Sequence, residues 1–188
     1  MVHNYIPSVL IPFTLGVEEI ELVAVADILR RADVDVCLAS LDGQPVTGRS
    51  NIVVHADAAL ADVMSRSWDM LVLPGGLPNA ELLSQNPLVQ AMTTSMVEQG
   101  KYIAAICAAP KALADFGLLD GKKVTSHPSV KEKIMTSSSA IYLEQAVVED
   151  GLLITSRGAG TAVSFALILV AKLTSRAQAD NIKQAILA

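Results

Sequence analysis

Cys107 is the side chain in this sequence best placed to do chemistry. It follows the apolar run Tyr102–Ile106, and the small residues Ala108 and Ala109, a proline and a helical pattern come after it. This pattern predicts a strand, a sharp turn that carries the thiol, and a helix that begins directly behind it. Because unpaired N–H groups at a helix start favour an anion, we expect a reactive thiol. The alternative is an inert buried cysteine, the more common fate of this residue.

The second cysteine, Cys37, lies inside the apolar strand pattern Val34–Leu41 with no turn after it. We interpret it as a small core residue. Two cysteines provide no disulfide framework, and the sequence has no Cys/His spacing typical of a zinc site. We therefore expect no metal site and a reducing, cytoplasmic setting.

Glu21 and His127 are the candidates to move protons at Cys107. Glu18 and Glu19, beside Glu21 at the start of a predicted helix, are explained by the helix macrodipole alone. A carboxylate facing a thiolate raises the thiol pKa, so Glu21 helps only if burial keeps it protonated. His127 follows a short strand and precedes a proline that keeps it extended. A lone loop histidine is usually a surface residue, but this position makes His127 the best candidate base.

Backbone N–H groups complete the candidate site. The turn Pro74-Gly75-Gly76 ends a buried strand, and its N–H groups, together with that of Ala108, are placed to form an oxyanion hole. The alternative is an ordinary tight turn. A phosphate-binding loop is a weaker interpretation, because neither common glycine-rich phosphate motif occurs. The segment Ser156–Thr161 is also glycine-rich; packing of the following helix is its more common purpose, and proximity of Gly158 to the site is the other possibility.

The elements that must position these residues alternate along the chain. Predicted strands are Val9–Ile11, Val34–Leu41, Ile52–His55, Asp69–Leu73, Tyr102–Ile106, Lys123–Thr125 and Leu152–Thr155. Predicted helices are Glu18–Arg31, Pro87–Gly100, Lys111–Phe116, Thr161–Leu173 and Gln178–Leu187. This alternation indicates an α/β fold with a mostly parallel sheet covered on both faces. Ligands of such folds bind at the carboxyl ends of the strands, so the candidate residues are expected along one edge.

Composition narrows the class of protein. The 188 residues suit a single domain, residues 1–188, with a sizeable core. A hydrophobic content of 52% with 18% charged residues excludes a disordered chain. The net charge of −5 argues against general nucleic-acid binding. The longest charge-free apolar segment, Gly158 to Ala171, is too short to cross a membrane, and Met1–Tyr5 lacks the pattern of a signal peptide.

The motifs together resemble the ThiJ/PfpI superfamily, and most closely its parkinsonism-associated protein deglycase branch. They are Gly16–Glu21, Arg30–Ala32, Val72–Gly76, Ala104–Pro110, Thr125–Pro128 and Thr155–Thr161, which in this order and spacing extend over nearly the whole chain. The resemblance implies a flavodoxin-like three-layer α/β/α sandwich that forms a homodimer. Asp27 and Arg31 would lie near the dimer interface and the entrance to the site.

The resemblance also assigns roles within the site. Cys107 would be the nucleophile at a strained turn, with Glu21 as its protonated partner and His127 as the assisting residue. The oxyanion hole would be lined by Gly75, Gly76 and Ala108. Three positions depart from the family pattern: Ala109 replaces a common glycine, Ala159 a common proline, and His55 a cysteine of the animal relatives. The interface redox chemistry of those relatives is therefore not expected here.

Members of this branch are described as cofactor-independent glyoxalases and deglycases. They convert methylglyoxal or glyoxal, free or as early adducts of amines, to lactate or glycolate. We therefore expect the Cys107 thiolate to attack an α-oxoaldehyde carbonyl while His127 moves protons. The alternative is an oxidative-stress sensor and redox-regulated chaperone that uses the same cysteine. The intact set of Glu21, Cys107 and His127 argues against a purely structural relative, and the motifs supply no peptide-sized site for a protease.

Overall fold

The computed structural model describes residues 5–188, and a seven-stranded sheet forms its centre. The strands are β1 (Ser8–Phe13), β2 (Asp35–Ser40), β5 (Ala58–Ala59), β6 (Met70–Leu73), β7 (Tyr102–Ile106), β10 (Val147–Asp150) and β11 (Leu153–Ser156). Their order is β10-β11-β7-β6-β1-β2-β5, and every neighbouring pair is parallel except β10 with β11. The predicted α/β class with a mostly parallel sheet is confirmed.

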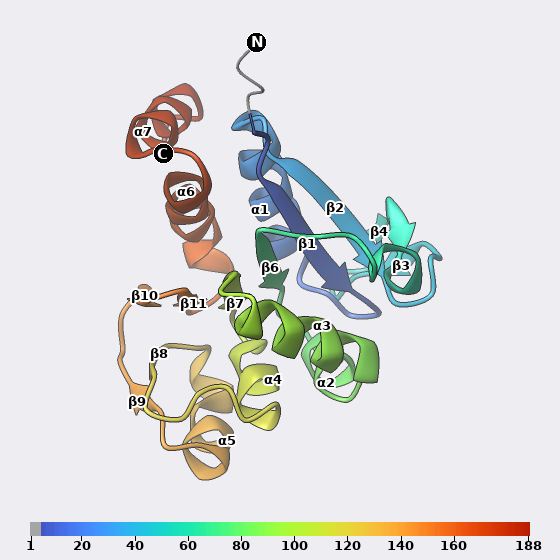
Figure 1. Ribbon diagram of the computed structural model, residues 1–188, viewed down its shortest axis with the longest axis vertical. Helices are drawn as coiled ribbons and strands as arrows, with labels where there is room; N and C mark the ends of the chain where they lie inside the picture. Colours follow the sequence, from blue (N-terminus) through green and yellow to red (C-terminus); the bar gives the residue numbers. More distant parts are fainter. Residues whose placement is uncertain (1–4) are drawn as a thin grey trace.

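Helices lie on both sides of the sheet (Figure 1). One side carries α1 (Glu19–Arg31), α6 (Ala162–Leu173) and α7 (Arg176–Ala185). The other side carries α2 (Asn79–Ser84), α3 (Pro87–Glu98), α4 (Pro110–Asp115) and α5 (Pro128–Ser137). Short 3₁₀ turns occur at Leu60–Val63 and Ala159–Thr161, and two strand pairs stand outside the main sheet: β3 (Val46–Thr47) with β4 (Val53–Val54), and β8 (Lys123–Val124) with β9 (Ile141–Tyr142). This is the flavodoxin-like three-layer arrangement that the resemblance implies.

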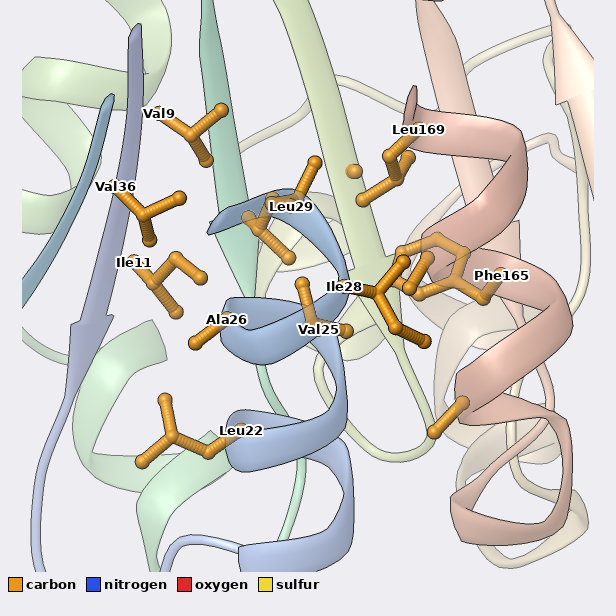
Figure 2. Packing of buried hydrophobic residues seen from close by; sticks show 14 of the residues in the cluster. Val9, Ile11, Leu22, Val25, Ala26, Ile28, Leu29, Val36, Phe165 and Leu169 are labelled. Carbon is orange, nitrogen blue, oxygen red and sulfur yellow. The ribbon is translucent and has the colours of Figure 1, made fainter. Parts of the chain in front are cut away.

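Side chains of β1 alternate between the two layers of core. Val9 and Ile11 pack toward α1 and α6, whereas Leu10 belongs to the opposite layer. Figure 2 shows the first layer, where Leu29 of α1 points toward the strand residues and Phe165 of α6 packs against α1. All five side chains are almost completely buried. A central strand with apolar residues on both faces is what a doubly covered parallel sheet requires.

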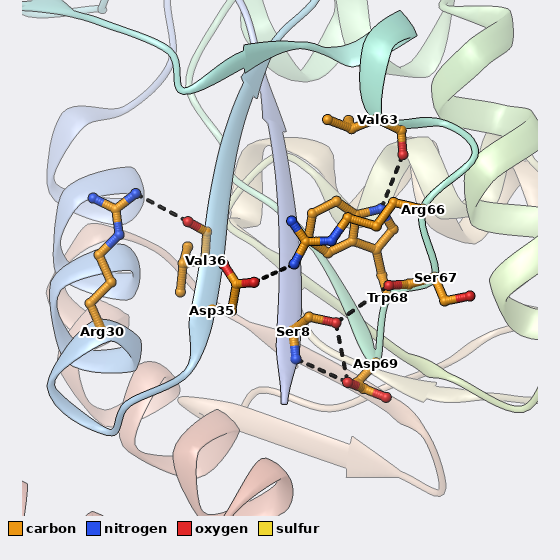
Figure 3. Close-up of polar contacts among 9 residues, drawn as sticks. All are labelled: Ser8, Arg30, Asp35, Val36, Val63, Arg66, Ser67, Trp68 and Asp69. Atoms are coloured by element: carbon orange, nitrogen blue, oxygen red, sulfur yellow. Dashed lines mark hydrogen bonds and ion pairs between the residues drawn. The ribbon is translucent and has the colours of Figure 1, made fainter. Parts of the chain in front are cut away.

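Asp69 links three strands at the amino edge of the sheet, and Figure 3 shows its contact with Ser8 at the start of β1. Its carboxylate accepts hydrogen bonds from the backbone N–H of Ser8 at 2.9 Å, the Tyr5 hydroxyl at 2.5 Å and Lys101 Nζ at 3.1 Å. Burial alone would raise the pKa of Asp69, but these hydrogen bonds and the Lys101 charge lower it. The residues precede or begin β1, β6 and β7, so their contacts fix the register at the edge opposite Cys107.

The sequence patterns do not predict α2 or α5. Each is short and buries few apolar side chains, Ala80 and Leu83 in α2 and Val130 and Ile134 in α5, so its helical period is weak. His127 has the predicted extended backbone, with φ −61° and ψ 137°, but it also serves as the N-cap of α5. Within residues 5–188, no helix combines the length and the apolar character needed to cross a membrane.

Candidate active site

Cys107 lies on a strained turn between β7 and α4. Its φ is +64°, a left-handed conformation that non-glycine residues rarely adopt. Two hydrogen bonds hold the backbone there: the Cys107 N–H donates to Ser156 O at 2.9 Å, and the Cys107 carbonyl accepts from the His127 N–H at 2.7 Å. The predicted sharp turn is therefore present, and neighbouring segments from β11 and α5 maintain its strain.

Glu21 extends from the start of α1 into the same site. Its side chain is fully buried, and Oε2 accepts a hydrogen bond from the Gly75 N–H at 2.8 Å. No nitrogen or oxygen pairs with Oε1, and the thiol of Cys107 is the second hydrogen-bonding partner of this carboxyl, beside the Gly75 N–H. Burial raises the pKa of Glu21 to about 7, although the bonds from Cys107 and Gly75 oppose the rise. Burial therefore acts in the direction that a protonated Glu21 requires.

The pKa of the Cys107 thiol is higher than the helix start alone would predict. Burial, followed by the charge of Glu21 and the hydrogen bond to it, raises the pKa of Cys107 to about 12. The N–H groups of Ala108 and Gly76 lower it, but they do not offset the burial. The start of α4 is therefore not sufficient to produce a thiolate at neutral pH while Glu21 is ionised.

The carboxyl and the thiol form a coupled pair, because two negative charges at this separation repel each other. After one proton has left, the remaining proton is shared between Glu21 and Cys107. When Glu21 holds it, the repulsion disappears and the N–H groups of Gly76 and Ala108 point at a thiolate. The thiolate is present in the state in which the carboxyl, and not the thiol, is protonated.

Gly158 borders the three candidate side chains and leaves a small space among them. A methyl group on its Cα would lie 3.7 Å from His127 Cδ2, 3.8 Å from Cys107 Sγ and 4.0 Å from Glu21 Oε1. These are ordinary contact distances, so a small group fits at this point. The proximity of Gly158 to the site, left open by the sequence, is confirmed.

The ring of His127 faces this space with its Nδ1 already engaged. Nδ1 accepts a hydrogen bond from the Ser129 N–H at 3.2 Å and lies 2.8 Å from Ser129 Oγ. An N–H donor requires an unprotonated Nδ1, so the neutral ring carries its hydrogen on Nε2. In this tautomer Nε2 is a hydrogen-bond donor, which does not support the role of base that the sequence analysis predicts for His127.

Gly75 and Gly76 bring two loops against the reactive residues. A methyl group on Gly75 would lie 2.6 Å from both Cys107 Cβ and Glu21 Oε2. Gly76 has φ +91°, and a methyl group there would lie 2.3 Å from Gly16 O. Only glycine allows this approach, which explains the Gly-Gly pair on structural grounds.

Two residues near the site have no signal in the sequence. Arg49, in the loop between β3 and β4, lies with Nη1 3.3 Å from Glu18 Oε2. Asn79, the first residue of α2, is fully buried beneath the Gly75–Gly76 turn. Each is separated from its partners by a loop, so only the folded chain reveals the contact.

Other features of the described residues lie apart from this site. Cys37 is a free cysteine in β2 with 7% of its surface exposed, in agreement with its predicted place in the core. Among residues 5–188, no group of three or more histidine, cysteine or acidic side chains is arranged to hold a metal. A cavity of about 210 Å³ lies among the ends of α3, β7 and β11 and contains none of the candidate site residues.

Comparisons with known proteins agree with the fold and the motifs. The model of the DJ-1/PfpI family matches residues 7–172. Protein dj-1beta of Drosophila melanogaster is 39% identical over 181 residues, which cover 96% of this chain and 96% of the relative. The glutathione-independent glyoxalase DJR-1.2 of Caenorhabditis elegans is 36% identical over 156 residues, which cover 83% of this chain and 82% of the relative.

The three-dimensional likeness is equally extensive. The crystal structure of Drosophila melanogaster DJ-1beta has a TM-score of 0.94 to this chain at 38% sequence identity. The match covers 98% of this chain and 99% of the crystallised one. The resemblance deduced from the motifs is confirmed, and the chain belongs to the DJ-1/PfpI family.

Proposed function

We propose that this protein is a cysteine-dependent, cofactor-independent glyoxalase that acts on methylglyoxal or glyoxal. The observation that carries the proposal is the strained Cys107 beside the buried, protonatable Glu21, with backbone N–H donors at the sulfur. The small space beside Gly158 suits a substrate of a few atoms. The name of the Caenorhabditis elegans relative supports enzyme activity on the same class of small aldehyde.

The reaction begins when the proton of the pair resides on Glu21. The Cys107 sulfur attacks the aldehyde carbon of methylglyoxal, a C–S bond forms, and the carbonyl electron pair moves onto oxygen. The N–H groups of Gly76 and Ala108 stabilise the negative charge that develops. Glu21 then gives its proton to this oxygen, which leaves a neutral hemithioacetal and a carboxylate.

The hemithioacetal next isomerises to a thioester. Glu21 takes the hydrogen of the former aldehyde carbon as a proton and returns it to the neighbouring carbon. The hydroxyl proton moves to the second oxygen, toward which Nε2–H of His127 donates. The product is the lactyl thioester of Cys107. Water cleaves its C–S bond, releases lactate and restores the protonated pair, so methylglyoxal and water are the only reactants.

The proposal extends to early adducts of aldehydes with amines. In a hemiaminal the amine occupies the position of a hydroxyl on the former aldehyde carbon. Displacement of the amine by Cys107 gives the same hemithioacetal, and the free amine leaves with a proton. Hydrolysis of the thioester then completes a deglycase reaction that needs no residue beyond those of the glyoxalase.

Replacement of each cysteine in turn tests the proposal. Cys107→Ala is expected to abolish lactate release from methylglyoxal, because it removes the sulfur that Glu21 and the backbone N–H donors contact. Cys37→Ala is expected to retain it, because Cys37 is buried in β2. Enzymatic lactate assays on both purified variants give the answer. Equal activity in the two variants would refute the mechanism.

A redox function of the same thiol has one observation in its favour. Cys107 is partly exposed whereas Cys37 is buried, so peroxide reaches only the former directly. Both thiols are free, in keeping with the reducing cytoplasmic setting that we propose. Under mild peroxide, a stable gain of two oxygens at Cys107 by intact mass supports sensing. Resistance to peroxide together with turnover of methylglyoxal supports the enzyme.

We also propose that the protein forms a homodimer through the exposed face of α1 and the neighbouring loops. This face has five apolar side chains that are each more than half exposed: Leu15, Ile20, Val23, Ile52 and Val53. Farther along α1, Asp27 and Arg31 form an ion pair of 2.7 Å on the surface. Exposed apolar side chains beside charged residues are typical of an interface between copies of a chain.

Val23→Arg tests the dimer, because a charge at the centre of this face opposes its burial. Sedimentation is expected to show a dimer for the original protein and a monomer for the variant. Leu187→Arg is the control, since Leu187 is also exposed but lies at the far end of the chain. A monomeric original protein would contradict the proposal.

A further inference from the structure

Asn79 is the most fully engaged side chain beneath the reactive turn. It is completely buried, which is uncommon for an amide. Its Oδ1 accepts from the Thr14 N–H at 2.8 Å, and its Nδ2 donates to Pro74 O at 2.8 Å and to Gly75 O at 3.0 Å. These partners determine the orientation of the amide, since exchange of its oxygen and nitrogen would oppose like groups at all three contacts.

The two carbonyls held by Asn79 belong to the peptide groups that face the reactive pair. Both peptide bonds are trans, so each N–H points away from the carbonyl of its own peptide group. With Pro74 O drawn toward Asn79, the Gly75 N–H points at Glu21 Oε2, 2.8 Å away.

The second peptide group is held in the same way. Gly75 O accepts from Asn79 and also from the Glu18 N–H at 3.1 Å. The Gly76 N–H then points in the opposite direction, where its hydrogen bond lowers the pKa of Cys107. One side chain therefore orients the donor to the carboxyl and the donor to the sulfur.

The glycines create the need for such a restraint. No Cβ fits at Gly75 or Gly76, yet glycine backbone rotates more freely than any other. Without a fixed partner, the two peptide groups are free to turn their N–H groups away from the charges they stabilise. Asn79 removes that freedom from a position that contacts neither Cys107 nor Glu21.

We propose that Asn79 is a positioning residue that aligns these two N–H donors and thereby sets the apparent pKa at which the Glu21–Cys107 pair loses its first proton. The inference deepens the proposed function, since it concerns the same thiol, but it is read out without turnover. Both donors stabilise a negative charge, so loss of their alignment raises the apparent pKa of the pair whichever atom carries the charge.

Alkylation of Cys107 by iodoacetamide, followed by intact mass across pH 5 to 10, measures this pKa. Asn79→Ala removes all three hydrogen bonds, and Asn79→Asp keeps the shape and the acceptor for Thr14 but loses the two N–H donors. Both variants are expected to alkylate about tenfold more slowly at pH 7, with the midpoint of the rate moved upward by about one pH unit. Circular dichroism and thermal melting establish that each variant is folded.

Asn86→Ala is the matched control. Asn86 caps α3 by accepting from the N–H groups of Leu88 and Val89, so its loss weakens a nearby helix without touching the site. Its alkylation profile is expected to match that of the original protein. A folded Asn79 variant with an unchanged midpoint would overturn the inference, as would an equal shift in Asn86→Ala.

Two further measurements keep the test independent of variant stability and of the proposed reaction. In the original protein, both side-chain amide protons of Asn79 are expected to exchange slowly with solvent by NMR, because both donate to buried carbonyls. Rapid exchange overturns the inference even if no variant folds. If lactate release survives in Cys107→Ala, the proposed function fails, whereas the alkylation midpoints still decide the role of Asn79.

Discussion

Cys37 and Cys107 are both free thiols, one within a strand of the sheet and one directly after a strand of the same sheet, and burial raises the pKa of each. Cys37 lies within β2, where the strand continues past it and no carboxyl or backbone donor bonds to its sulfur among the described residues. Cys107 lies just beyond β7, where the chain turns and Glu21 meets the sulfur. Burial alone raises the pKa of a thiol and keeps it protonated and unreactive. A buried thiol beside a carboxyl that accepts its proton can instead become a thiolate.

The largest expected effect comes from the glycine that brings the turn to the carboxyl. Gly75→Ala forces apart Cys107 Cβ and Glu21 Oε2, each only 2.6 Å from the new methyl group. We expect turnover of methylglyoxal to fall by about 1,000-fold, since donor and nucleophile both move. Steady-state kinetics and a thermal melt measure the change. Near-normal turnover in a folded variant would mean that Cys107 works without this geometry.

Glu21→Gln separates the charge of the carboxyl from its proton transfer. The amide retains an acceptor for the Gly75 N–H and presents an NH₂ group to the sulfur, so the pKa of Cys107 is expected to fall. Alkylation of Cys107 at pH 7 should therefore become faster while turnover drops by about 100-fold. Glu19→Gln is the control, since Glu19 bonds to the N–H groups of Ser50 and Ile52 instead. Parallel loss of both readouts would contradict the assignment.

The pH dependence of stability should reveal the titration of Glu21, the carboxyl that Cys107 has beside it and Cys37 lacks. The pKa of Glu21 rises from 4.5 to about 7 on folding, so the folded state binds this proton more tightly than the unfolded state. Its contribution is full below about pH 4.5 and is lost as the pH rises through 7. Urea unfolding should show the stability of the original protein relative to Glu21→Gln falling by up to about 3 kcal/mol across this range. A constant difference would show that Glu21 does not titrate as described.

Gly158→Val probes the space in front of Cys107. A side chain here starts at ordinary contact distance from Cys107 Sγ and from His127, so the protein should fold. The added methyl groups occupy the position of the aldehyde, and we expect kcat/KM to fall by about tenfold. Gly160→Ala, with open space around it, should leave kcat/KM unchanged. Equal effects of the two substitutions would place the substrate elsewhere.

The smallest effect is expected at the other thiol. Cys37→Ala removes a buried sulfur and should cost about 1 kcal/mol of stability, measured by urea unfolding. Alkylation of Cys107 and turnover should both stay within about twofold of the original protein, because β1 and β6 separate β2 from β7 in the sheet. A larger loss of activity would show that the two cysteines are coupled.

Sequence patterns predict the strands and helices whose apolar residues recur with a regular period. The predicted strand Tyr102–Ile106 has the same bounds as β7 in the structure. Cys107 and Gly75 lie directly after the ends of β7 and β6, as predicted. The period predicts the helix that carries Glu21, whereas its pairing with Cys107 is implied by the family resemblance. The patterns fail where a contact depends on loops: nothing local marks Asn79 or α5, and the tautomer of His127 depends on Ser129 in three dimensions. The sequence pattern also predicts too large an effect of the helix start on the pKa of Cys107. Burial of the thiol, which depends on the whole fold, raises this pKa instead.

The carbonyl of Cys107 accepts a hydrogen bond from the N–H of His127, the residue before α5. The buried side chains of α5 are those of Val130 and Ile134. Such a peripheral helix opens by local unfolding more readily than the central sheet. When it opens, the strained turn loses one of its two restraints and relaxes. The protein should therefore lose catalytic competence in a sub-global transition, at a temperature below that of the cooperative melt, with early hydrogen exchange in α5 as its sign.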